Sequence, residues 1–170
     1  MKAVKSLMTI RHGLIAGLSG GLAEIGWVTL YGKATGDNIA ILARGITTAA
    51  GVGALFPAYS VAVGITIHMG LACVLGVVLA FAWRASEAIR GRSANPYPFM
   101  LAALTVVWAV NFLVVLPLVS PEFVHLVPYA VSLTSKLLFG LASAEAFRRQ
   151  NLAATAAGEV NHRCHISQRT

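Results

Sequence analysis

Four polar side chains interrupt the apolar stretches of this chain at positions where they could do chemistry: Glu24, His68, Asn111 and Lys136. An ionisable residue within a membrane helix is costly, which makes it a candidate functional site by default. A histidine beside a carboxylate is suited to proton transfer near neutral pH or to binding a polar head group such as a quinone carbonyl. A structural role is the alternative, in which Glu24 and Lys136 form a buried pair that His68 completes.

The stretches that hold these residues have the length of membrane-spanning helices, which need roughly 20 mostly apolar residues. They cover residues 12–31, 58–83, 98–118 and 124–147. At about 1.5 Å of rise per residue, Glu24, His68 and Asn111 all fall roughly 5 Å to one side of the middle of their spans. Lys136 falls at or close to the middle of its own span. The sequence therefore predicts one polar group per span in nearly the same layer.

The composition points to a membrane protein as well. The chain has 170 residues, of which 57% are hydrophobic and 11% are charged. Soluble domains carry about 25% charged residues, so a soluble globular enzyme is excluded, as is a disordered chain. Two cysteines are too few for a disulfide scaffold. We expect an all-α integral membrane protein.

The basic residues predict the topology. If the fifth apolar stretch, residues 38–56, does not span, one side of the membrane receives ten basic residues, namely Lys2, Lys5, Arg11, Arg84, Arg90, Arg92, Arg148, Arg149, Arg163 and Arg169. The other side receives only Lys33 and Arg44. Basic loops face the cytoplasm, so both termini are predicted to be cytoplasmic. The net charge of +7 is then explained without nucleic acid as a partner.

This topology gives a four-helix membrane domain over residues 1–150 and a polar cytoplasmic tail over 151–170. Residues 38–56 become an external interfacial or re-entrant helix between the first two spans, capped by Asp37 or Asn38. Multi-pass insertion makes the lipid bilayer itself the first partner.

Small residues predict where the helices pack. Glycines recur at helical spacing on the faces that carry the ionisable residues, namely Gly13, Gly17 and Gly21 before Glu24, Gly64 and Gly76 around His68, and Gly140 after Lys136. Small residues four apart let membrane helices approach closely. The three ionisable groups should therefore face the bundle interior, whereas Asn111 lies off the small-residue stripe of its span.

Prolines add local predictions near the outer face. Pro117, late in the third span, and Pro128, early in the fourth, should each kink a helix. The sequence Ser120-Pro121-Glu122 is typical of a helix N-terminus. Together with residues 38–56, these features predict an outer vestibule above the polar layer.

Patterns for other chemistry are weak. No catalytic nucleophile constellation and no metal site is predicted. A haem within the membrane is not predicted either, because His68 is the single mid-membrane histidine and a bis-histidine haem needs two. The tail residues His162, Cys164 and His165 do not have the spacing of a zinc or haem motif. We expect no cofactor, with quinone or haem present only if a partner supplies it.

One resemblance concerns the second half of the chain. Trp108 to Phe112, Pro117, Pro121, Tyr129 and Ser135-Lys136 form a pattern that resembles small four-span proteins of bacterial inner membranes. The resemblance implies an inner-membrane location and assigns no residue a role.

Two functions are expected from these features. The first is a small, non-catalytic accessory or structural subunit of a larger inner-membrane complex, such as a respiratory or energy-transducing one, with other membrane subunits or further copies of itself as partners. The second is a small oligomeric transporter or channel, or a proton-coupled quinone-binding protein, that uses the cluster of Glu24, His68 and Lys136.

Overall fold

The fold is helical throughout the part of the chain that the structure describes. A computed structural model gives the backbone of residues 2–36, 38, 40–55, 57–90 and 95–167. These residues form helices joined by short connections, and no strand occurs among them. The prediction of an all-α protein is confirmed.

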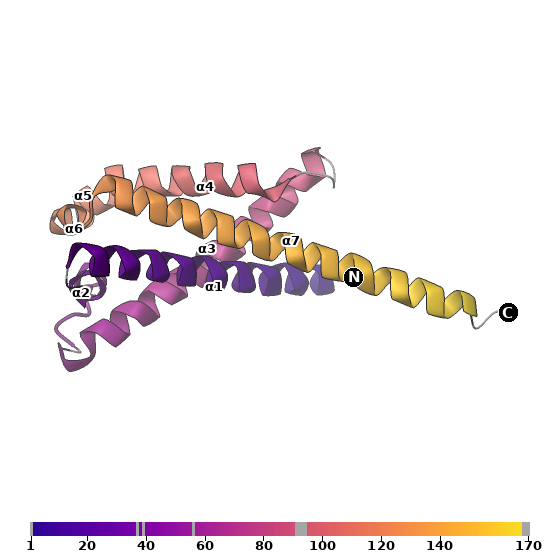
Figure 1. Ribbon diagram of the computed structural model, residues 1–170, viewed down its shortest axis with the longest axis horizontal. Helices are drawn as coiled ribbons and strands as arrows, with labels where there is room; N and C mark the ends of the chain where they lie inside the picture. Colours follow the sequence, from indigo (N-terminus) through magenta and orange to yellow (C-terminus); the bar gives the residue numbers. More distant parts are fainter. Residues whose placement is uncertain (1, 37, 39, 56, 91–94, 168–170) are drawn as a thin grey trace.

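Long helices make up most of the structure (Figure 1). They are α1 (Lys2–Thr35), α3 (Ser60–Arg90), α7 (Tyr129–Ser167) and α4 (Pro96–Val110), which continues through the π-helical turn η2 (Asn111–Val115) into α5 (Leu116–Val119). The short elements are α2 (Ala40–Ala49), η1 (Pro57–Tyr59) and α6 (Pro121–Leu126).

Three helical stretches are long and apolar enough to cross a membrane, namely Ser6–Thr35, Pro57–Glu87 and Pro96–Val119. They correspond to the first three predicted spans. Helix α7 has the length but carries Lys136 and Glu145 within its apolar half, which lowers its hydropathy. The fourth span therefore stays a prediction.

Helix α1 lies at the centre of the arrangement. It packs against α3 on one side and α7 on the other, and α4 packs against α7. Helices α3 and α4 diverge from their connection, where the rings of Trp83 and Phe99 lie 5.3 Å apart (Figure 1). The N-terminus of α1 and the C-terminal end of α7 point toward one end of the bundle, and α2, α5 and α6 lie at the other.

Glycines bring α1 and α3 into backbone contact. A β-carbon on Gly13 or Gly17 would collide with backbone atoms of α3 around Gly76 and Ala72, and one on Gly21 would meet the Ala72 side chain. This is the seam that the spacing predicts. Gly64 differs, because its neighbour is the Ala43 backbone of α2 rather than another long helix.

A second set of small residues on α1 faces α7. Ser143 donates a hydrogen bond to the carbonyl oxygen of Ala16 (3.0 Å), and the ring of the fully buried Phe139 occupies the space beside Gly20. At the far end, Nε1 of Trp27 donates to the carbonyl oxygen of Val131 (3.1 Å). Residues at intervals of about four on each antiparallel helix therefore fix the register of α7 against α1.

The face predicted to pack in the fourth span is shared between two helices, because Gly140 and Ser132 contact α4 whereas Lys136 reaches Glu24 of α1. Gly140 lies against the backbone of Met100, and Nε1 of Trp108 donates to Oγ of Ser132 (2.9 Å). Here the packing is looser, because a β-carbon on Gly140 would find ordinary van der Waals contacts.

The two prolines behave differently from each other. Pro117 lacks an N–H, and the helix before it widens into the π-turn η2, in which Leu116 N–H bonds to the carbonyl of Asn111. Pro128 was predicted to kink a helix, but it lies between two helices instead. The chain is extended at Val127, the residue before it, so α6 ends at Leu126 and α7 begins at Tyr129 rather than at 124.

Helix boundaries near the ends of the predicted spans also differ. Helix α2 begins after Asn38, whose Oδ1 accepts the Ala40 N–H (3.0 Å), whereas Asp37 lies outside the described residues. Ser120 occupies the N-cap position of α6 without a side-chain capping bond. Helix α7 continues to Ser167, so the predicted tail extends the last helix.

The α1–α3 seam predicts opposite effects for two alanine substitutions in the same helix. Gly17→Ala should lower stability by about 1–3 kcal/mol, because its new β-carbon meets backbone that cannot rotate away. Gly26→Ala is the matched control, since no atom of the described residues lies within 4 Å of its β-carbon position. It should be neutral or stabilising by about 0.5–1 kcal/mol. Thermal unfolding in mild detergent, followed by circular dichroism, measures both, and equal midpoints would contradict the close contact.

Candidate functional site

The carboxylate of Glu24 is the centre of a buried polar cluster. Nζ of Lys136 lies 2.6 Å from its Oε1, and Oγ of Ser135 donates a hydrogen bond to the same oxygen (3.1 Å). Nε2 of His68 lies 3.5 Å from the other oxygen, Oε2. The Glu24 residue is only 3% exposed. Three helices, α1, α3 and α7, thus bring together three of the four polar residues that the sequence singled out.

Helix register explains why these side chains meet. The contacts of Ala16, Gly20 and Trp27 with α7 place Glu24 opposite the turn that holds Ser135 and Lys136. Lys136 also lies over the ring of Phe139, with Nζ 5.8 Å from the ring centre. An ammonium over an aromatic face gains additional stabilisation in surroundings that contain little water.

Glu24 and His68 keep unused hydrogen-bonding capacity. Among the described residues, neither Oε2 of Glu24 nor Nε2 of His68 has a hydrogen-bond partner, and both atoms are buried. Their 3.5 Å separation is longer than a good hydrogen bond between such groups. An unsatisfied buried polar atom costs about 1–3 kcal/mol. The arrangement therefore leaves two polar atoms available to a third group.

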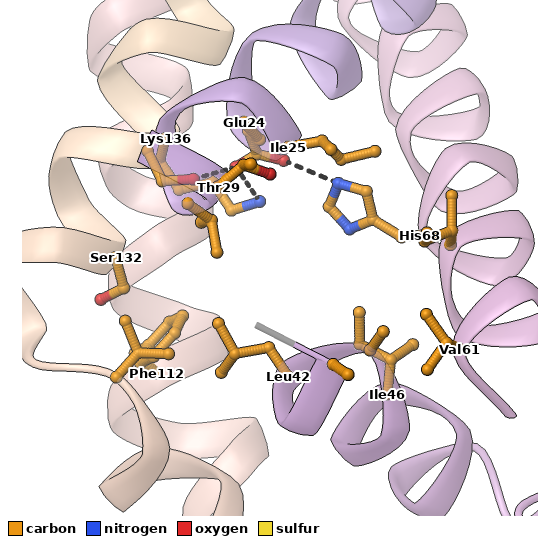
Figure 2. A pocket seen from close by; sticks show the side chains of 16 residues that line it. Glu24, Ile25, Thr29, Leu42, Ile46, Val61, His68, Phe112, Ser132 and Lys136 are labelled. Carbon is orange, nitrogen blue, oxygen red and sulfur yellow. Dashed lines mark hydrogen bonds and ion pairs between the residues drawn. The ribbon is translucent and has the colours of Figure 1, made fainter. Parts of the chain in front are cut away.

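A cavity of about 360 Å³ opens next to these atoms (Figure 2). Figure 2 shows Glu24, His68 and Lys136 on one side of it and Leu42 and Ile46 of α2 on the opposite side. Most of the remaining wall is apolar, with Ser132, Ser135 and Thr29 as further polar residues. An apolar cavity of several hundred Å³ with a few convergent polar groups is typical of a small-molecule site.

Asn111 does not touch Glu24, but it is not remote from the cluster. It lines a second cavity, of about 550 Å³, whose wall also includes Glu24, His68 and Lys136. Its position in the π-turn η2 is notable, because such turns are frequent at functional sites.

Compared with protein-family models, curated proteins and solved structures, the chain shows no match. The chemistry of the site is therefore inferred from its geometry.

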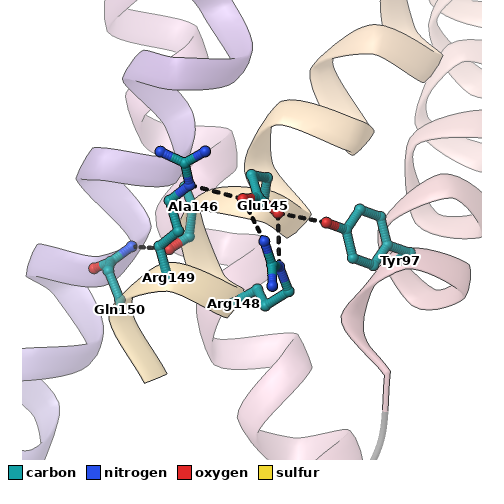
Figure 3. A network of polar contacts seen from close by, with 6 residues as sticks. All are labelled: Tyr97, Glu145, Ala146, Arg148, Arg149 and Gln150. Carbon is teal, nitrogen blue, oxygen red and sulfur yellow. Dashed lines mark hydrogen bonds and ion pairs between the residues drawn. The ribbon is translucent and has the colours of Figure 1, made fainter. Parts of the chain in front are cut away.

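A second polar network lies near the opposite end of the bundle (Figure 3). The Tyr97 hydroxyl donates to Oε2 of Glu145 (2.5 Å), and Arg148 and Arg149 bond to the same carboxylate. The arginines belong to the same helix as Glu145 and are half or more exposed, so solvent weakens these contacts. This network ties the start of α4 to α7.

Metal ligands do not gather in the part of the chain that the structure describes, where no three His, Cys, Asp or Glu side chains form a group. The side chains of His162, Cys164 and His165 lie outside the described residues, as does that of His125.

Sequence reasoning missed two residues that build the site. Ser135 bonds directly to the Glu24 carboxylate, and Gly20 makes room for Phe139 beneath Lys136. Gly20 was accessible from the four-residue spacing of Ala16, Gly20 and Glu24, a stripe as regular as the glycine stripe that faces α3.

The buried pair predicts strong coupling between two substitutions. Glu24→Gln leaves the Lys136 ammonium without its charged partner, and Lys136→Met leaves the carboxylate without one. Each should lower stability by about 3–5 kcal/mol. The double variant should be more stable than the sum of the two effects allows. Detergent unfolding of the four proteins measures the coupling, and strictly additive losses would show that the two charged groups do not stabilise each other.

Proposed function

We propose that this chain is a four-span protein of the bacterial inner membrane, with both termini in the cytoplasm and α2 at the outer face. The distribution of basic residues supports this topology. Arg11, Arg84 and Arg149 belong to the helix ends nearest the two termini, whereas Lys33 and Arg44 belong to the other end. Helix α2 has 10 residues, about half of the length needed to cross the membrane.

Within this topology, we propose that the protein binds a small molecule with a polar head group at Glu24, His68 and Lys136. The observation that carries the proposal is a pair of buried atoms, Oε2 of Glu24 and Nε2 of His68, that have no hydrogen-bond partner among the described residues and belong to side chains lining an apolar cavity. A bound hydroxyl could donate a hydrogen bond to Oε2 of Glu24 and accept one from the N–H of His68, whereas a bound carbonyl could accept from His68 alone. Binding would then recover the cost of leaving them unpaired.

Proton exchange is a chemical property that such a site offers. A neutral imidazole accepts a proton at a free ring nitrogen, and a carboxylate oxygen accepts one from a hydroxyl. His68 and Glu24 present one group of each kind to the same cavity. We therefore propose proton-linked binding, as in a quinone-binding protein or a proton-coupled transporter, rather than a catalytic site of the protein's own.

The competing proposal is an accessory subunit in which the cluster only holds the helices together. Such a role needs the Glu24–Lys136 pair but gives no reason for the adjacent cavity or for the unused atom of His68. The geometry therefore favours binding. Stoichiometric co-purification with larger membrane subunits, in a preparation that lacks any bound small molecule, would favour the subunit role.

Analysis of the purified protein tests the binding proposal. Organic extraction and mass spectrometry should find one small molecule per chain in the native protein, or one that reloads from membrane lipid extract. Occupancy should fall on the order of tenfold in His68→Leu, as expected for the loss of a buried polar contact. Thr66→Val is the control, since Thr66 lies on the same helix, is exposed and bonds to its own backbone. Equal occupancy in both variants would contradict the site.

The topology makes a separate prediction about α7. In a chain whose Cys73 and Cys164 are replaced by serine, Glu122→Cys should react with a membrane-impermeant maleimide on intact spheroplasts. Arg149→Cys should react only after the membrane is opened. Both positions are exposed in the structure and flank the predicted fourth span. Reaction of both residues in intact spheroplasts would show that α7 does not cross the membrane.

A further inference from the structure

The larger cavity is a groove between α3 and α4 that meets the polar cluster. Its walls come from α3, through Leu71, Val74 and Val78, and from α4 and its continuation, through Val107. Glu24, Lys136 and Phe139 line it from α1 and α7, on the inner side. Figure 1 shows α3 and α4 diverging from each other.

The groove has an apolar, exposed wall. Leu71, Val74 and Val78 are each more than half exposed, at 63%, 62% and 56%. They lie three to four residues apart, so they form one face of α3. In a membrane, such a face contacts hydrocarbon chains. The groove therefore opens sideways toward the lipid, whereas the smaller cavity lies beneath α2.

The π-turn η2 aligns the opposite wall. Val107 and Asn111 are four residues apart, and Leu116 follows after five, which is the spacing of a π-turn. In an uninterrupted α-helix, Leu116 would be rotated away from the other two residues. All three line the groove.

Both cavities are lined by the same three polar residues and one apolar residue, namely Glu24, His68, Lys136 and Ile46. A molecule that occupies the groove therefore lies against the Glu24 and His68 residues, on a side that continues to the exposed face of α3.

We propose that the groove holds the hydrocarbon tail of a neutral amphiphile, which enters from the bilayer between α3 and α4 and places its oxygen-bearing head at Glu24 and His68. This inference rests on the proposed binding function and names its ligand class and its route. The occupant is a single lipid-like molecule whose head carries hydroxyl or carbonyl oxygens.

Charge balance selects a neutral head. The carboxylate of Glu24 and the ammonium of Lys136 already offset each other. An anionic or cationic head would bring an unpaired charge into a mostly apolar cavity, which is strongly unfavourable. A hydroxyl can donate to Oε2 of Glu24, and a carbonyl can accept from the N–H of His68. Quinols and quinones with a long tail meet this description, and so do neutral diglycerides.

Photolabelling of the reconstituted full chain tests the route. The probes are a long-chain benzoquinol and a diacylglycerol, each with a diazirine in its tail, and the same quinol head without a tail as a competitor. In the native protein, a tailed probe should label the α3 face at Leu71, Val74 and Val78. Tailed unlabelled quinol or diacylglycerol should compete on the order of tenfold better than the tailless head. The preferred probe distinguishes a quinone-type ligand from a glyceride.

A pair of tryptophan substitutions provides the structural control. Val107→Trp fills the groove and should reduce labelling on the order of tenfold. Val106→Trp adds the same bulk to the neighbouring residue, which is 61% exposed and lines neither cavity, and should leave labelling unchanged. Circular dichroism of both variants checks that they fold.

The outcomes separate this inference from the proposed function. If the tailless head binds as tightly as the tailed probes, or if Val107→Trp labels like Val106→Trp, the groove is not the route, although the binding site stands. If no probe binds and no small molecule is found in the native protein, both proposals are wrong.

Discussion

The burial of one carboxylate is the constraint on which the rest of the structure depends. Glu24 lies in the interior of a helix that is long and apolar enough to cross a membrane, so its charge requires a cation and hydrogen-bond donors. Lys136 and Ser135 provide them from α7. Satisfying this carboxylate sets the register of α7 against α1, and the contacts of Phe139 with Gly20 and of Ser143 with Ala16 occur in the same register.

The cavities follow from how α3 meets this pair of helices. Gly13 and Gly17 bring the backbone of α3 against α1 on the side of the termini, whereas α2 lies against Gly64 toward the other end. Helix α3 therefore crosses α1 and diverges from α4 (Figure 1). The space that remains lies beside Glu24, at the one oxygen that Lys136 and Ser135 leave unbonded. The same geometry thus creates both the space and the cluster of polar residues that lines it.

Two sequence features were sufficient to predict which ionisable residues meet. They are the distance of each residue from the middle of its span and the helical spacing of small residues. They placed Glu24, His68 and Lys136 in one layer, because rise per residue and the length of a span are nearly fixed quantities. They did not predict which neighbouring helix each stripe of small residues contacts. Helix α1 has small residues on two faces, and periodicity alone does not say which face meets α3 and which meets α7. Ser135 was missed for a related reason, since a serine in an apolar helix commonly bonds to its own backbone.

Pro117 and Pro128 show why local chemistry was harder to predict than the arrangement. Both remove a backbone donor, but the effect depends on the position relative to a helix start, which tertiary contacts decide. At Pro128 the missing N–H falls where a helix has no intrahelical use for it, so α7 begins there. At Pro117 it falls inside a continuing helix, and the chain responds with the π-turn that holds Asn111. Because that turn keeps Leu116 on the wall of the groove, a proline outside the polar cluster helps shape the cavity beside that cluster.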